Sequence, residues 1–98
     1  MYFIQPTRNI PYLDQVLSTL PGVQMIHIDD IDLYDPTILA IADVQDYLTH
    51  QWSLPTIVLA FENEGTPLAQ AWELGALAGW IWNKLPSDPE EALLKIDA

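Results

Sequence analysis

Short apolar runs alternate along this chain with segments that carry helix-start signals. The clearest run, residues 56–61, is β-branched and apolar and follows Pro55, which is typical of a buried strand. Thr66 and Pro67 then stand in the order of a helix cap and a first helical residue, and good helix formers fill residues 68–77. Strands that alternate with helices build βαβ units and a parallel sheet. The sequence therefore predicts an α/β fold.

The same alternation extends over the rest of the chain. We expect further strands at residues 2–4, 23–28, 37–42 and 80–82, and further helices at 12–20, 45–52 and 89–96. The acidic segment 31–36 is predicted to be a turn, so the connection between the strands at 23–28 and 37–42 lacks a full helix. The 98 residues contain no linker or repeat, and a chain of this length has room for one core. We therefore expect one domain, residues 1–98, with three layers and a five-stranded parallel sheet.

Charge and composition narrow the classes of partner. Three basic residues face fourteen acidic ones, which gives a net charge of −11. Nucleic acids and anionic membranes are bound by clustered Lys and Arg, so we expect neither as a partner of this domain. The chain has no cysteine, which excludes disulfides and thiolate chemistry. No signal-peptide pattern or membrane-length apolar run is visible, and we expect a cytoplasmic protein.

Several segments, taken in order, resemble the receiver domain of response regulators. In that family a strand of the type PIIVLTA leads to a helix ending LGA, then to a GYL strand before a Lys-Pro pair, and to a helix opening DPEEL. The matching segments here are residues 35–44, 55–60, 71–76, 79–81 and 84–94. The resemblance implies a flavodoxin-like fold with strand order 2-1-3-4-5, and a role in two-component signalling and transcription regulation. It places Asp43 at the phospho-acceptor position.

The chain departs from the receiver pattern around that acceptor. Gln5 and Pro6 stand where receivers have the two acidic residues that hold magnesium. Ala60 replaces the hydroxyl residue of the fourth strand, and Lys84 is one position away from the family's lysine. Phosphoryl transfer needs a divalent cation to neutralise charge on the phosphate oxygens. We therefore expect a non-catalytic pseudo-receiver that has no cofactor and in which Asp43 is not phosphorylated through magnesium chemistry.

A metal-dependent switch or small enzyme at the acidic edge of the sheet is the alternative. Asp29, Asp30 and Asp43 follow predicted strands, at the edge where open α/β sheets bind ligands. In the receiver order, the first strand separates the aspartate pair from Asp43 by about 10 Å, so we expect no metal site. His27 and His50 have no metal-ligand spacing.

Two other families share short features with the chain. Gly65-Thr66 with the segment 72–75 weakly resembles the nucleoside deoxyribosyltransferases, in which the residue matching Glu73 is the nucleophile; the spacing here is longer. Pro55 before a strand resembles the thioredoxin fold, which would make residues 68–74 an edge strand and the protein a cysteine-free adaptor.

Tryptophans gather late in the sequence. Strand alternation puts Trp80 and Trp82 on one face, where they form either core or a contact surface. Receivers commonly associate through this part of the fold, and tryptophan is frequent at interface hot spots. We therefore expect a protein partner, or a homodimer, at the face formed by the helix 68–77, the strand 80–82 and the helix 89–96. Its expected contact residues are Trp72, Leu77, Trp80, Trp82, Lys84 and Lys95.

Overall fold

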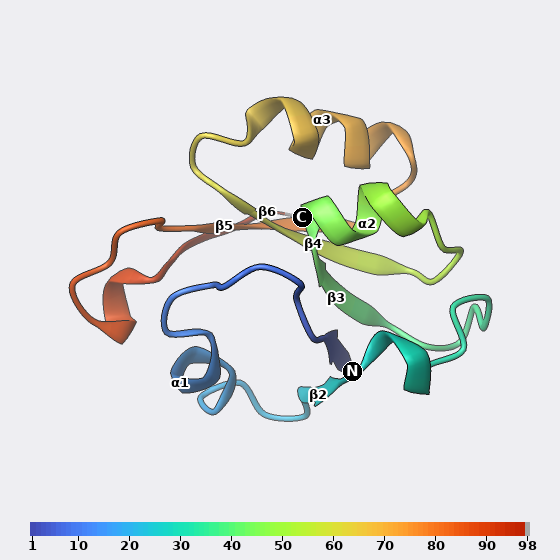
Figure 1. Cartoon of the computed structure of the whole chain (residues 1–98), viewed down its shortest axis with the longest axis horizontal. Helices are drawn as coiled ribbons and strands as arrows, with labels where there is room; N and C mark the ends of the chain where they lie inside the picture. Colours follow the sequence, from blue (N-terminus) through green and yellow to red (C-terminus); the bar gives the residue numbers. More distant parts are fainter. Residues whose placement is uncertain (98) are drawn as a thin grey trace.

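One mixed sheet of six strands organises the molecule, in the order β2-β1-β3-β4-β5-β6 (Figure 1). The computed structural model describes the backbone of residues 1–97 and the side chains of residues 1–94. The first five strands are mutually parallel, and β6 pairs with β5 in the antiparallel sense. The strands are β1 (Tyr2–Ile4), β2 (Gln24–Ile26), β3 (Ala40–Asp43), β4 (Thr56–Phe61), β5 (Ala78–Trp82) and β6 (Leu93–Asp97).

Helices cover both faces of the sheet, which gives three layers. Figure 1 shows α1 (Leu13–Leu17) on one side and α2 (Val44–His50) and α3 (Gly65–Glu73) on the other. Two separate apolar clusters fill the spaces between these layers. One includes Phe3 and Leu59 with α1, and the other includes Val58 and Ala60 with α2 and α3. The predicted α/β class is confirmed.

The first half of the chain has shorter elements than the apolar pattern predicts. Helix α1 starts after Tyr12, which lies in the left-handed region at φ 60° and provides no side-chain cap. Strand β3 starts only at Ala40, because Asp35 accepts hydrogen bonds from the Thr37 N–H and hydroxyl at 2.9 and 2.7 Å and holds a turn there. The second connection contains only the short 3-10 helix η1 (Ile28–Asp30).

The C-terminal segment corrects the predicted helix over residues 89–96. Asp88 caps the Glu91 N–H at 3.1 Å, but the helical turn is only the 3-10 helix η2 (Pro89–Glu91). After it, the chain turns into β6, and Leu93 pairs with Trp82. Pairing satisfies the backbone groups that the edge of β5 would otherwise leave open. The predictions of five strands and an entirely parallel sheet are therefore wrong.

Residues 68–74 do not form the edge strand that the thioredoxin alternative requires. They lie in or directly after α3. A Cβ added at Gly79 would come within 3.2 Å of Leu68 Cδ1 and 3.4 Å of Trp72 Cζ2, so the missing side chain lets the helix approach the strand.

Candidate functional site at the carboxyl edge of the sheet

Asp43 occupies the end of a fully buried strand. It is the last residue of β3 and also the N-cap of α2, and its exposed fraction is 0%. A buried carboxylate is stable only when it is paired or hydrogen-bonded. The helix contributes a weak hydrogen bond from the Gln45 N–H, at 3.5 Å. The main partner of Asp43 comes from another part of the chain.

That partner is Arg8, in the loop between β1 and α1. Its Nε and Nη2 donate to the two carboxylate oxygens of Asp43 at 2.7 and 2.8 Å. Its Nη1 and Nη2 donate to the two oxygens of Glu64 at 3.0 and 2.6 Å. One guanidinium therefore binds two carboxylates, each in the bidentate geometry that gives strong charge-assisted hydrogen bonds. We name this arrangement the Arg8 clamp.

Glu64 is held in place by neighbours other than Arg8. Its Oε1 accepts the Phe61 N–H at 2.9 Å, and its Oε2 accepts Gln45 Nε2 at 3.0 Å. The Arg8 guanidinium carbon also lies 4.4 Å from the centre of the Phe61 ring, within the range of a cation–π contact. The clamp thus connects the loop after β1 with the ends of β3 and β4.

A second set of contacts ties the same loop to α2. The Thr7 N–H and hydroxyl donate to the two Asp46 oxygens at 3.1 and 2.8 Å. We call residues 7–12, which carry Thr7 and Arg8 and end at the left-handed Tyr12, the strap. Every buried side-chain nitrogen or oxygen in the described part of the chain has a hydrogen-bond partner.

The clamp gives its members opposite pKa shifts. Burial raises the pKa of Asp43, and the neighbouring charge of Asp46 adds to this, although Arg8 acts against it. Burial also acts to raise the pKa of Glu64, but the hydrogen bonds from Arg8, the Phe61 N–H and Gln45 outweigh it, so this pKa lies below its usual value. Burial opposes the charge of Arg8, yet its two carboxylate partners raise the pKa of the guanidinium overall.

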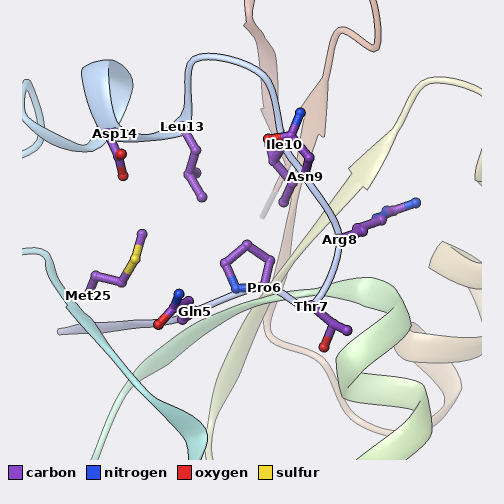
Figure 2. A pocket seen from close by; sticks show the side chains of 9 residues that line it. All are labelled: Gln5, Pro6, Thr7, Arg8, Asn9, Ile10, Leu13, Asp14 and Met25. Carbon is purple, nitrogen blue, oxygen red and sulfur yellow. The ribbon is translucent and has the colours of Figure 1, made fainter.

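Two cavities lie on either side of the strap, and both are lined by Thr7 and Arg8. The larger, of about 430 Å³, lies between the loop after β1, the start of α1 and Met25 of β2. Figure 2 shows the Arg8 side chain directed away from Leu13, Asp14 and Met25 of this cavity. The second, of about 370 Å³, is lined also by Asp43, Asp46 and His50.

None of the residues that the receiver pattern grouped around Asp43 is a hydrogen-bond partner of its side chain. Gln5 is exposed, Pro6 is half-buried, and both line the larger cavity. Ala60 is fully buried in the cluster under α2 and α3. Lys84 is exposed and is not among the hydrogen-bond partners of Asp43. The cation beside Asp43 is Arg8, which was not among the residues selected from the sequence.

The other candidate ligands lie apart from the clamp. Asp29 and Asp30 are exposed in η1, and β1 separates their strand from β3. His27 accepts the Asp29 N–H through Nδ1 at 3.2 Å, and His50 stacks on Trp52 with a ring separation of 6.1 Å. Among the described residues, no group of three or more His, Cys, Asp or Glu side chains is placed to hold a metal ion.

Only some of the residues expected to form the protein contact are exposed. Trp80 and Trp82 are 5% and 0% exposed and belong to the core, and Trp82 Nε1 donates to the Pro11 carbonyl at 2.9 Å. Of the two roles expected for these residues, core and contact surface, the structure shows the core role. A helix–strand–helix face is also absent, because residues 93–97 form β6. Trp72, Leu77 and Lys84 are exposed, and the side chain of Lys95 lies outside the described residues.

No protein-family model, curated protein or solved structure matches the chain. The resemblance to receiver domains therefore rests on the segments quoted above. In the part of the chain that the structure describes, no helix has the length and apolar character needed to cross a membrane.

Proposed function

We propose that this protein is a non-catalytic receiver-like domain of a signalling or regulatory system, which acts through contact with another protein. The observation that carries the proposal is the Arg8 clamp. A carboxylate that attacks a phosphoryl donor needs a free oxygen and a divalent cation beside it. Both Asp43 oxygens instead accept hydrogen bonds from Arg8, and the guanidinium supplies the neutralising charge from within the chain.

Whether Asp43 accepts a phosphoryl group is tested by incubation with acetyl phosphate and magnesium, followed by intact mass spectrometry. We expect the mass of the wild-type protein to stay unchanged, because the Arg8 clamp blocks the acceptor. Asp43→Asn serves as the matched control. A stable phosphoryl adduct on the wild type that disappears in Asp43→Asn would show a working acceptor and overturn the proposal.

The contact that we propose is the apolar surface at the end of α3. Three exposed side chains form this α3 surface: Trp72, Leu74 and Leu77 are 37, 52 and 54% exposed. These residues are close in sequence, and exposed apolar patches are typical of interaction sites. Tyr47 and Trp52 of the α2 region line a small cavity together with Leu74.

Charge favours a basic partner over a second copy of the chain. The net charge is −11, and one of the three basic residues, Arg8, is engaged by two carboxylates. Two such chains repel one another, whereas basic residues around an apolar contact are attracted to this protein. We therefore assign the α3 surface to an apolar segment of another protein with basic residues on its rim.

A pair of synthetic amphipathic helices tests this assignment, one of Leu and Lys and one of Leu and Glu. We expect saturable binding of the Leu/Lys peptide only, and loss of that binding in Leu74→Ser/Leu77→Ser. Leu85→Ser is the matched control, since Leu85 is 87% exposed and lies outside the α3 surface. Binding that is equal in the two variants would contradict the assignment. A dimer in light scattering that depends on Leu74 and Leu77 would replace the basic partner by a second copy.

A further inference from the structure

The surroundings of Arg8 match the way a guanidinium group is recognised. Asp43 and Glu64 approach its edges with two oxygens each, at distances between 2.6 and 3.0 Å. Phe61 lies under its face, with the ring centre 4.4 Å from the guanidinium carbon. Carboxylates in the plane and an aromatic ring on the face are the two contacts that a planar guanidinium makes best. An ammonium group cannot form the same set of bonds, because it is a point charge with no plane.

Each of these three groups has an anchor in the fold besides Arg8, although for the Asp43 side chain this is only the 3.5 Å hydrogen bond from the Gln45 N–H. The Phe61 N–H and Gln45 Nε2 hold both oxygens of Glu64. Asp43 is fixed as the buried end of β3, and Phe61, only 6% exposed, is the buried end of β4. Glu64 and the ring therefore keep their positions when the guanidinium leaves, and Asp43 stays at the buried end of its strand.

Arg8 lies in the first part of the strap, while the second part is anchored in the core by the buried side chain of Ile10 and by the Pro11 carbonyl, which accepts the Trp82 indole N–H. On the strap, Thr7 and Asn9 are exposed, and the strap lies over the carboxyl edge of the sheet with a cavity on each side. The cavity of about 370 Å³ is lined by Asp43 and by the exposed His50 and Thr49 of α2. A side chain from outside the protein can therefore reach Asp43 through this cavity once the strap is displaced.

We propose that Asp43, Glu64 and Phe61 form a guanidinium receptor, which Arg8 fills as a tethered ligand and which accepts an arginine side chain of a partner protein when the strap lifts. The net charge of −11 favours the approach of an arginine-bearing segment. The nearby Asp46 adds a third carboxylate to the site, and it loses its Thr7 partner in the same movement. The inference concerns the clamp contacts alone, so it does not depend on the α3 surface or on the outcome with acetyl phosphate.

The experiment removes the tethered ligand and supplies one from solution. The variant Arg8→Ala is titrated with N-acetyl-arginine amide, and with N-acetyl-lysine amide as the matched probe, while backbone amide signals of residues 43–46 and 61–64 are followed by NMR. We expect saturable shifts with the arginine probe and binding of the lysine probe that is weaker by about tenfold or more, the loss of one charge-assisted hydrogen bond. The added change Glu64→Gln should abolish the difference between the probes.

The wild-type protein provides the second arm. We expect no saturable shifts there at the same probe concentrations, because Arg8 already fills the site. If Arg8→Ala does not fold, Arg8→Lys keeps the positive charge without the planar group and is titrated in its place. Equal binding of the arginine and lysine probes to the variant would refute the receptor. Arginine binding at residues 43–46 and 61–64 of the wild type, as tight as in the variant, would refute its occupation by Arg8.

Discussion

Removal of the Arg8 side chain is the perturbation whose cost follows most closely from the structure. Arg8→Ala leaves Asp43 and Glu64, with side chains 1 and 11% exposed, without their shared cation. Loss of one partner from a buried ion pair costs about 3–5 kcal/mol, because the remaining charge is buried without compensation. The Arg8 side chain is itself 24% exposed, which places the expected cost near the lower end, about 3 kcal/mol.

A loss of that size is easy to measure in a domain of about a hundred residues. It corresponds to a melting temperature lower by roughly 12–24 °C. The assay is urea denaturation at pH 7, followed by tryptophan fluorescence, with the melting temperature as a second readout. Lys84→Ala is the matched control, since it changes the net charge by the same amount at an exposed position. For the control we expect a change within about 0.5 kcal/mol.

The cause of the loss is tested by a second substitution. If the uncompensated carboxylates destabilise Arg8→Ala, then the added change Asp43→Asn should restore a substantial part of the free energy of unfolding. The same change in the wild type should destabilise, because it breaks the bidentate pair. The reasoning is refuted if Arg8→Ala loses no more stability than Lys84→Ala, or if Asp43→Asn costs the same with and without Arg8.

Three further predictions concern ionisation, the core and the net charge. Because the pKa of Asp43 is raised in the folded protein, Asp43 stabilises the fold below the ordinary carboxyl pKa. This contribution to the free energy of unfolding is lost as the pH rises through the folded pKa. Because the pKa of Glu64 is lowered, Glu64 stabilises the fold above the ordinary carboxyl pKa, and this contribution is lost as the pH falls through the folded pKa. Carboxyl-carbon NMR should therefore show Glu64 titrating at a lower pH than Asp43. The reverse order would contradict these pKa shifts. Trp82→Ala should lower the free energy of unfolding by about 3–5 kcal/mol and leave the oligomeric state unchanged in sedimentation, whereas a change in association without destabilisation would place Trp82 at an interface. Because the net charge is −11, salt up to physiological concentration should raise the melting temperature at pH 7, and solubility should be lowest near pH 4.1; a melting temperature indifferent to salt would make long-range repulsion unimportant.

Local sequence signals predicted the central strands and helices because those elements are decided by local pattern and burial. Residues 56–61 are strand β4 at the predicted positions, and α3 begins near the predicted start, although its N-cap is Glu64 and not Thr66. The helix predicted in the C-terminal segment was wrong because the capping signal there starts only a single helical turn. Asp88 caps one turn, and the apolar residues that follow fit a strand as well as a helix, so pairing with β5 decides between them.

The Arg8 clamp was not predictable in the same way. Arg8 is 35 residues from Asp43 and 56 from Glu64, so no local spacing connects the three. One indirect signal exists: Arg8 is one of only three cations in an acidic chain, and it follows the first strand at the edge where Asp43 also lies. Strand order brings β1 and β3 side by side, and only the folded arrangement shows which carboxylates share the guanidinium.

The most direct test of the closed Arg8 clamp is NMR of the Arg8 side chain in the wild-type protein. A guanidinium held by four hydrogen bonds cannot rotate freely, and its Nε–H exchanges slowly with water. We predict a protected Arg8 Nε–H signal and separate signals for the Nη protons at neutral pH, all lost in Asp43→Asn/Glu64→Gln. A rapidly exchanging Nε–H and averaged Nη signals in the wild type would mean that Arg8 is free in solution, and would contradict the account of Asp43 as a blocked acceptor.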